Sequence, residues 1–263
     1  MNPASLKQEP GVIRFDHVVE SGLSQRTHIS RKLWVAMAGR AGLMLKPVPK
    51  MPLVVDIETV GRSVDEIPER ALEILFRSLG RMEGSEEEME ARRREMIERF
   101  GLDPTTGRIV CIGLLEAEST RQEAYYGTDE KVLLRSFWEY LGRNRPELFV
   151  TFNGKSFDFP YINMRSAILE ISPSIPLPTR RYSTSPHFDV REVLAGDDRH
   201  RRGTLDYFCA VFGIPSPKAE LDGSQIDEAF RSGRHQEIGR YCLADCQATA
   251  ALYERLKAFY PTS

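Results

Sequence analysis

Two carboxylates stand two residues apart in a stretch that has the pattern of a strand, LVVDIETV, residues 53–60. Side chains at positions i and i+2 of a strand share one face, about 6–7 Å apart along the backbone, so Asp56 and Glu58 would lie together. Like charges this close raise each other's pKa unless a cation compensates them, and divalent cations with oxygen ligands are the usual partners. The stretch predicts a metal-binding strand end or, as the plainer alternative, a strand end whose acids face water.

Two further acids occur in contexts that would bring them to the same place. The segment NGKSFD follows a strand-like run and delivers Asn153, Phe157 and Asp158 beyond its carboxyl end, where open α/β sheets gather their ligand sites. Tyr241 and Asp245 are four residues apart in a helical pattern and therefore share a helix face. Four carboxylates on three elements suit two divalent ions about 3.5–4 Å apart, the arrangement used for in-line attack on phosphodiesters.

The elements that must position these residues alternate between strands and helices. Two more strands are expected, at 108–118 and 123–129, and with the strand at 53–60 they would form a meander. Asp129 is placed to cap a following amphipathic helix, and Gly213 is placed to end a later one. The remaining expected elements are a strand, turn and helix over 147–171, a short strand or turn at 187–194 and a mostly helical segment over 224–260 that is broken near residues 232 and 233.

Two segments lie outside this pattern. Residues 1–50 carry eight Lys or Arg against three acids and show no clear strand before Met51. Residues 29–45 of this extension could form a short amphipathic helix packed on the domain. Residues 63–104 predict a charged helical insertion, solvated rather than in contact with substrate. Either segment could cover the cleft or set strand preference, and the N-terminal extension is a possible site for a protein partner.

Composition bounds the class of protein. The 263 residues, 41% hydrophobic and 28% charged, are sufficient for one sizeable domain with an extension. A net charge of -2 excludes a globally basic nucleic-acid binder, so a polyanion would be met by local patches or by metal. The four cysteines show no disulfide or zinc-ribbon spacing, and Cys242 and Cys246 are expected to be small buried residues, not ligands. No membrane-spanning run or secretory leader is visible, so a soluble, cytoplasmic protein is expected.

The three motifs, taken in order, resemble those of the DEDD superfamily of exonucleases. The resemblance is carried by Asp-Ile-Glu-Thr at 56–59, by Asn153-Gly-Lys-Ser-Phe157-Asp158 and by Tyr241-x-x-x-Asp245. The histidine branch would have its histidine where Arg240 stands, so Tyr241 indicates the tyrosine branch. NGKSFDFPYI is similar to the proofreading exonuclease domain of B-family DNA polymerases, and GIPSPKAELDGSQIDEAF followed by YCLAD is similar to stand-alone bacterial predicted exonucleases related to it. The resemblance covers about residues 51–258.

This resemblance implies a role for each motif residue. Asp56, Glu58 and Asp245 would hold a first divalent ion, Mg²⁺ or Mn²⁺, which activates the attacking water. Asp56 would bridge to a second ion, supported by Asp158, which stabilises the leaving 3′ oxygen. Tyr241 would orient the water, because a phenol with a pKa near 10 is a poor general base at pH 7. A packed aromatic residue is the alternative for Tyr241.

Weaker candidates for substrate contact surround these residues. By the same analogy Asn153 and Phe157 would brace the active-site loop and contact the terminal nucleotide, against local turn capping and core packing. Thr59 would offer its backbone or hydroxyl to the 3′ end. A basic patch could contact phosphate, against a solvated loop; its members are Arg199, Arg201 and Arg202, together with Arg180 and Arg181.

Other acids and the histidines rank lower as metal ligands. Asp189 and Asp222 rank below Asp158 and Asp245 because they lack the motif context. His187 and His200 are expected to be surface or turn residues, because oxygen donors already supply the predicted metal site.

The sequence therefore predicts a mixed α/β domain of ribonuclease-H-like type over residues 51–263, with a sheet of about five strands and helices on both faces. The expected activity is metal-dependent 3′–5′ removal of nucleotides from single-stranded nucleic acid with a free 3′ end, DNA favoured, releasing 5′-monophosphates. An RNA-trimming exoribonuclease is one alternative, and a non-catalytic nucleic-acid-binding module on the same fold is another. The oligomeric state is left open.

Overall fold

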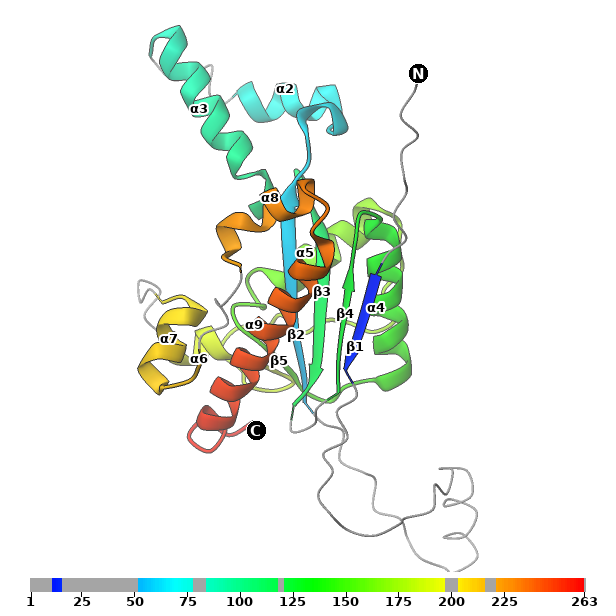
Figure 1. The fold of residues 1–263 in the computed structure, drawn as a ribbon, viewed down its shortest axis with the longest axis vertical. Helices are drawn as coiled ribbons and strands as arrows, with labels where there is room; N and C mark the ends of the chain where they lie inside the picture. The colour runs from blue at the N-terminus through cyan, green and yellow to red at the C-terminus, as the bar shows by residue number, and fades with distance from the viewer. Residues whose placement is uncertain are drawn as a thin grey trace, which may run out of the picture.

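The computed structural model describes residues 11–15, 52–77, 84–117, 121–196, 203–215 and 221–262. Its centre is one six-stranded mixed sheet with the strand order β1-β4-β3-β2-β5-β6 (Figure 1). The strands are β1 (Gly11–Phe15), β2 (Leu53–Gly61), β3 (Gly107–Glu116), β4 (Gln122–Tyr126), β5 (Phe149–Thr151) and β6 (His187–Asp189). The pairs β1–β4, β4–β3 and β3–β2 are antiparallel. The pairs β2–β5 and β5–β6 are parallel. The predicted mixed α/β fold is confirmed.

The sixth strand is a correction to the sequence analysis. β1 lies in the N-terminal extension, where no clear strand was expected, and pairs with the edge of β4, with Gly11 opposite Tyr126. Its five residues, GVIRF, are too short to stand out by alternation alone. The hydrogen-bonding edge that β4 offers decides that this segment is a strand, and that edge exists only in the folded sheet.

Helices cover both faces of the sheet. Asp129 caps α4 by accepting a hydrogen bond from the Val132 N–H, as predicted. Gly213, with φ 65°, ends α7, and Gly233, with φ 75°, separates α8 from α9 at the predicted break. The helices of the domain are α4 (Glu130–Asn144), α5 (Asp158–Ile168), α6 (Val190–Ala195), α7 (Leu205–Phe212), α8 (Ile226–Arg231) and α9 (His235–Leu256), with a 3-10 turn, η4 (Gly223–Gln225), before α8.

The core divides into two layers because β2 alternates. Leu53, Val55 and Ile57 pack with residues of α4 and α5 in one hydrophobic cluster. Val54 packs on the other face, with residues of α9. Side chains two apart in a strand share a face, so Asp56 and Glu58 lie on the same side as Val54. The helix α9 crosses this face of the sheet (Figure 1), and Cys242 of α9 lies 3.4 Å from Oδ2 of Asp56. The long C-terminal helix therefore covers the two acids.

The insertion is helical, as predicted. It contains η1 (Val64–Glu66), α2 (Glu69–Arg77), α3 (Glu86–Glu98) and η3 (Phe100–Leu102). Neither α2 nor α3 buries a residue, and both project from one end of the molecule (Figure 1). Glu95 of α3 and Arg99, four residues later, form an ion pair 4.0 Å apart. The expected helix at 29–45 lies outside the described residues, and the proposed domain limits stay a prediction.

None of the helices described here is long and apolar enough to cross a membrane.

Candidate functional site

The two acids of β2 lie opposite backbone positions of β3 that leave room for α9. Asp56 is paired with Gly113 and Glu58 with Cys111, and the register shifts directly after Glu58. A Cβ added at Gly113 would lie 2.8 Å from the Sγ of Cys242 and 3.0 Å from the Sγ of Cys246. Glycine at this position therefore lets α9 approach the sheet closely.

This close approach brings the C-terminal motif to the first one. The nearby charges of Asp56, Glu58 and Asp245 act on Tyr241, whose pKa is raised by burial first and then by these carboxylates. Burial also raises the pKa values of Asp56 and Glu58 well above normal, and Asp245 and Asp158 add to the shift. The structure thus places Asp158, Tyr241 and Asp245 within electrostatic reach of the two acids of β2.

Asp158 is the first residue of α5 and is buried. Its Oδ1 accepts a hydrogen bond of 3.1 Å from the main-chain N–H of Ile57, which lies between Asp56 and Glu58. Burial is the main reason that the pKa of Asp158 is raised to about 8, and the charge of Asp189 adds to the shift. The second motif is therefore fastened to the first by the backbone of β2.

The donor set of this site fits a divalent cation. Burial and the mutual repulsion of their negative charges raise the pKa values of Asp56 and Glu58, and a bound cation would relieve both effects. Oxygen donors of this kind suit Mg²⁺ or Mn²⁺. The sequence did not reveal that Cys242 joins the group: one ligand atom each from Asp56, Glu58 and Cys242 lie within 4.8 Å of one another.

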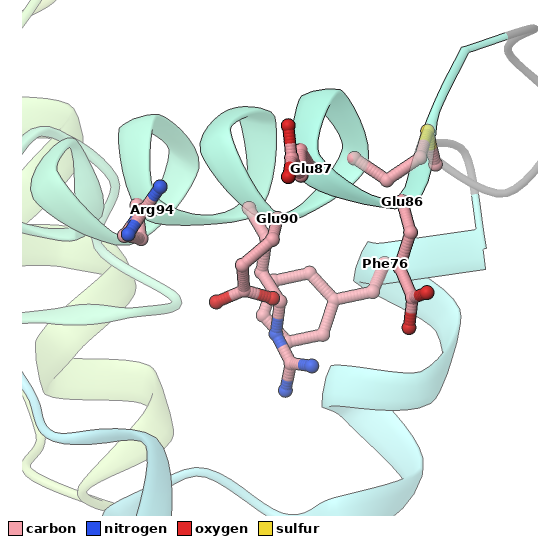
Figure 2. Close-up of a pocket in the computed structure, with 7 residues that line it drawn as sticks. Phe76, Glu86, Glu87, Glu90 and Arg94 are labelled. Carbon is pink, nitrogen blue, oxygen red and sulfur yellow. The ribbon is translucent and has the colours of Figure 1, made fainter.

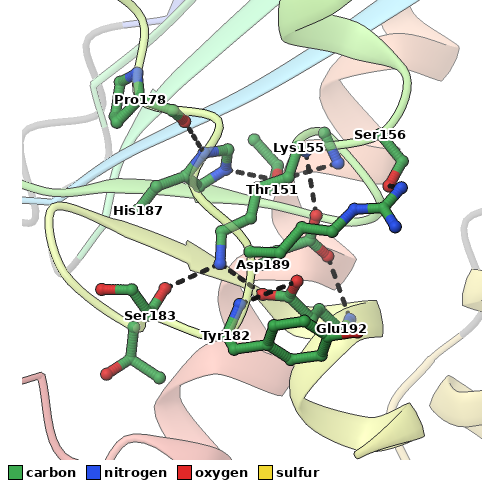
Figure 3. A network of polar contacts seen from close by, with 12 residues as sticks. Thr151, Lys155, Ser156, Pro178, Tyr182, Ser183, His187, Asp189 and Glu192 are labelled. Atoms are coloured by element: carbon green, nitrogen blue, oxygen red, sulfur yellow. Dashed lines mark hydrogen bonds and ion pairs between the residues drawn. The ribbon is translucent and has the colours of Figure 1, made fainter. Parts of the chain in front are cut away.

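A polar network holds the loop that leads from β5 to Asp158 (Figure 3). Asp189 accepts hydrogen bonds from the main-chain N–H groups of Asn153 (2.9 Å), Lys155 (3.0 Å) and Glu192 (3.1 Å). Asn153 itself adopts the left-handed conformation, with φ 72°. Asp189 thus ties the loop to the start of α6, a role that the sequence analysis missed although D-V-R-E has the capping-box spacing.

Beneath this loop lie a buried ion pair and a buried histidine (Figure 3). The Lys155 ammonium pairs with the Glu192 carboxylate and donates to the Ser183 carbonyl (2.7 Å). His187 was expected at the surface or in a turn, which is wrong: it is 1% exposed in β6. Its ring nitrogens lie 2.8 Å from Thr151 Oγ1 and 2.7 Å from the Pro178 carbonyl, and burial lowers its pKa to about 4. The neutral ring of His187 therefore joins β5 to the segment that contains Pro178.

The predicted substrate-binding residues make contacts within the protein. The Thr59 hydroxyl donates to the Gly101 carbonyl (2.8 Å), so it fastens β2 to η3. The Asn153 side chain accepts from Arg191 (2.7 Å), and Phe157 packs against the core. The packing of Phe157 matches its core-packing alternative, and contact of these residues with the terminal nucleotide stays a prediction. Arg199, Arg201 and Arg202, with His200, lie outside the described residues.

Asp222, the other acid ranked below the motif residues, caps η4. Its side chain accepts a hydrogen bond from the Ser224 N–H (3.0 Å) at the start of that turn. A hydrogen-bonded cap accounts for its carboxylate without any metal.

A separate hollow lies between the two helices of the insertion (Figure 2). Its volume is about 600 Å³. Arg93 stacks over the Phe76 ring at 4.5 Å inside it. Its remaining lining residues are Glu86, Glu87, Met89, Glu90 and Arg94, so no motif residue reaches it.

Known proteins are similar to this chain in sequence and in fold. A DNA polymerase of Desulfurococcus sp. (strain Tok) is 28% identical over 235 residues, which cover 80% of this chain and 29% of that protein. A DNA polymerase of Thermococcus gorgonarius is 27% identical over 239 residues, covering 81% and 30%. The chain therefore spans less than a third of the length of these relatives.

The family B DNA polymerase from the hyperthermophilic archaeon Pyrobaculum calidifontis shares the fold, with a TM-score of 0.53, 19% identity and coverage of 81% of this chain and 25% of that one. The model of the RNase_H superfamily matches residues 97–257, more than half of the chain. Together with the sheet and the motif residues on it, these matches confirm the family-level resemblance drawn from the sequence. The chain belongs to the RNase_H superfamily.

Proposed function

We propose that this protein is a metal-dependent 3′–5′ exonuclease that acts on single-stranded nucleic acid and releases 5′-monophosphates. The observation that carries the proposal is the gathering of four acids and Tyr241 from β2, α5 and α9 at one place. The similarity to DNA polymerases favours DNA as the nucleic acid.

The acids divide into two overlapping ligand sets. Asp56, Glu58 and Asp245 would hold one cation, and Asp56 with Asp158 would hold the other, directly or through water. Mg²⁺ or Mn²⁺ would supply the positive charge that lowers the pKa of an attacking water and offsets the charge on the leaving 3′ oxygen. The hydrogen bond between Asp158 and Ile57 fixes one set relative to the other before any cation arrives.

Tyr241 would act by orientation. The raised pKa keeps its phenol protonated at neutral pH, so the hydroxyl can donate or accept a hydrogen bond but cannot serve as a base. The hydroxyl also lies near η4, since a Cβ added at Gly223 would be 3.7 Å from it. The loop that begins at Asn153 and the backbone near Thr59 would receive the terminal nucleotide, and Arg199, Arg201 and Arg202 would contact phosphate.

The test is degradation of 5′-labelled single-stranded DNA and RNA of equal sequence, with Mg²⁺, with Mn²⁺ and with chelator. A ladder that shortens from the 3′ end is expected, lost with chelator and in Asp56→Asn and Asp245→Asn. Asp227→Asn, an exposed acid of α8 paired with Arg231, is the matched control and should behave as wild type. Binding without cleavage under every condition would replace the nuclease by a binding module, and faster cleavage of RNA would make it an exoribonuclease.

A further inference from the structure

Cys242 places a sulfur atom among the carboxylates of the proposed nuclease site. Its thiol lies 3.4 Å from Oδ2 of Asp56 and 3.5 Å from the main-chain oxygen of the same residue. One ligand atom each from Cys242, Asp56 and Glu58 form a triangle in which no separation exceeds 4.8 Å. Within the part of the chain that the structure describes, no other three Cys, His, Asp or Glu side chains form such a group.

The separation between sulfur and oxygen matches that of two ligands on one zinc ion. Zinc binds thiolate at about 2.3 Å and carboxylate at about 2.0–2.2 Å in tetrahedral geometry, which places the two donor atoms about 3.5 Å apart. The observed 3.4 Å between Cys242 Sγ and Asp56 Oδ2 is close to this value. A third donor, the Glu58 carboxylate, lies within reach of both. A site built for Mg²⁺ alone needs no sulfur, because that ion prefers oxygen.

The packing of α9 against the sheet sets the position of Cys242. The helix lies against the sheet at Gly113, the residue paired with Asp56, so the thiol projects toward Asp56. Cys242 is fully buried, and long side chains could not occupy the space. Two more buried thiols stand nearby: Cys111 is paired with Glu58, and the sulfur of Cys246 lies close to Gly113.

We propose that this site also takes a thiophilic divalent cation, Zn²⁺ or Cd²⁺, held by the Cys242 thiolate and the carboxylates of Asp56 and Glu58. This inference rests on the proposed function in one respect: the thiophilic ion would displace the Mg²⁺ or Mn²⁺ that the proposed nuclease uses. The thiol proton passes to solvent as the sulfur–metal bond forms, so binding weakens as the pH falls. Because the ion shares two ligands with the catalytic cations, it inhibits in competition with them.

Cd²⁺ titration of the full chain, in the absence of other divalent ions, tests the proposal. Binding is followed by calorimetry and by the thiolate-to-cadmium charge-transfer absorption in the ultraviolet, which needs no activity. One ion and a clear absorption band are expected for the wild type. Cys242→Ser should lose the band and bind Cd²⁺ at least about tenfold more weakly, and Glu58→Gln should weaken binding while keeping the band.

Two controls separate this site from other thiols. Cys209→Ser alters a buried cysteine of α7 in the hydrophobic cluster around α9 and should keep both the band and the affinity. Near-ultraviolet circular dichroism of each variant confirms that it is folded. A band that survives in Cys242→Ser overturns the proposal. So does equal loss in Cys111→Ser and Cys246→Ser with Glu58→Gln unchanged, because the ion would then lie among three sulfurs.

The outcomes also separate this inference from the nuclease proposal. Cleavage with Mg²⁺ but no Cys242-dependent Cd²⁺ band leaves the nuclease and overturns the sulfur ligand. A Cys242-dependent band without cleavage under any condition leaves the metal site and overturns the nuclease.

Discussion

The carboxylate of Asp158 accepts a hydrogen bond of 3.1 Å from the main-chain N–H of Ile57. Ile57 stands between Asp56 and Glu58, so the bond joins the start of α5 to the strand that carries the first two acids. A backbone hydrogen bond thus fixes where three of the four acids lie relative to one another. A site held in this way is preorganised, which lowers the cost of binding metal and substrate.

Asp158→Asn should make the metal-free protein more stable at alkaline pH. The folded pKa of Asp158 is about 8 against an ordinary 3.8, so between these values the folded protein retains a proton that the unfolded chain has released. The contribution of this group to the free energy of unfolding therefore falls as the pH rises from about 4 to 8. The asparagine oxygen can still accept from Ile57 and carries no charge.

Urea unfolding in chelator at pH 5 and pH 8 measures this effect. The gain from Asp158→Asn should be larger at pH 8, and Asp227→Asn should show no such dependence on pH. An equal gain at both pH values would mean that Asp158 does not titrate in this window.

Divalent cations should reverse this loss of stability. As the pH rises the buried carboxylates ionise, and a bound cation then compensates their charges. We expect Mn²⁺ to raise the melting temperature of the wild type more at pH 8 than at pH 5. The Asp56→Asn variant should respond far less at both pH values in differential scanning calorimetry. A rise that persists in this variant would place the cation elsewhere.

Tyr241→Phe should slow the chemical step without weakening substrate binding. The variant keeps the ring that packs against the core and removes the hydroxyl that would orient the water. Loss of correct positioning should lower kcat by roughly tenfold to a hundredfold. Steady-state kinetics on a single-stranded DNA oligomer should show KM nearly unchanged, and Tyr207→Phe, at an exposed tyrosine of α7, should match the wild type. A rise in KM at constant kcat would assign Tyr241 to substrate binding instead.

Gly113→Ala should damage stability and activity together. The added methyl group would lie 2.8 Å from the sulfur of Cys242, so α9 must shift outward. Overpacking of this kind costs about 1–3 kcal/mol. Because α9 also carries Tyr241 and Asp245, the shift separates them from β2 and lowers cleavage. Chemical unfolding and the nuclease assay measure the two effects.

The double variant Gly113→Ala/Cys242→Ala should recover part of the lost stability, because the second change removes the sulfur that the new methyl group meets. If Gly113→Ala alone unfolds like the wild type, close packing of α9 does not depend on this glycine.

Removing one partner of the ion pair beneath the β5–α5 loop should lower the free energy of unfolding. Lys155 has a side chain only 2% exposed, whereas that of Glu192 is 20% exposed. Glu192→Gln leaves a buried ammonium without its counter-charge and should destabilise by about 3–5 kcal/mol. Lys155→Met leaves the more exposed carboxylate and should cost less. Urea unfolding of both variants and of Lys155→Met/Glu192→Gln gives the coupling energy, and additive effects would contradict a mutual interaction.

Local periodicity determined much of the candidate site. A spacing of two residues in a strand places Asp56 and Glu58 on one face, and a spacing of four residues in a helix places Tyr241 near Asp245. Neither relation depends on the rest of the chain. Asp129 begins α4 and Gly213 ends α7 where predicted, because capping depends on neighbours in the chain. The family resemblance rested on these same short motifs.

Other features were decided by residues far apart in the sequence. The burial of His187 depends on its place in β6, and the strand at Gly11–Phe15 depends on the edge of β4. Asp189 is separated by 36 positions from Asn153, whose backbone it holds.

The sequence by itself thus determined which residues could share a face of one strand or helix, since backbone geometry alone sets that relation. The tertiary structure decided that the acids of β2 face α9 and that Cys242, 186 positions from Asp56, joins them. It did so because sheet pairing and the close approach at Gly113 arise only when distant segments pack together.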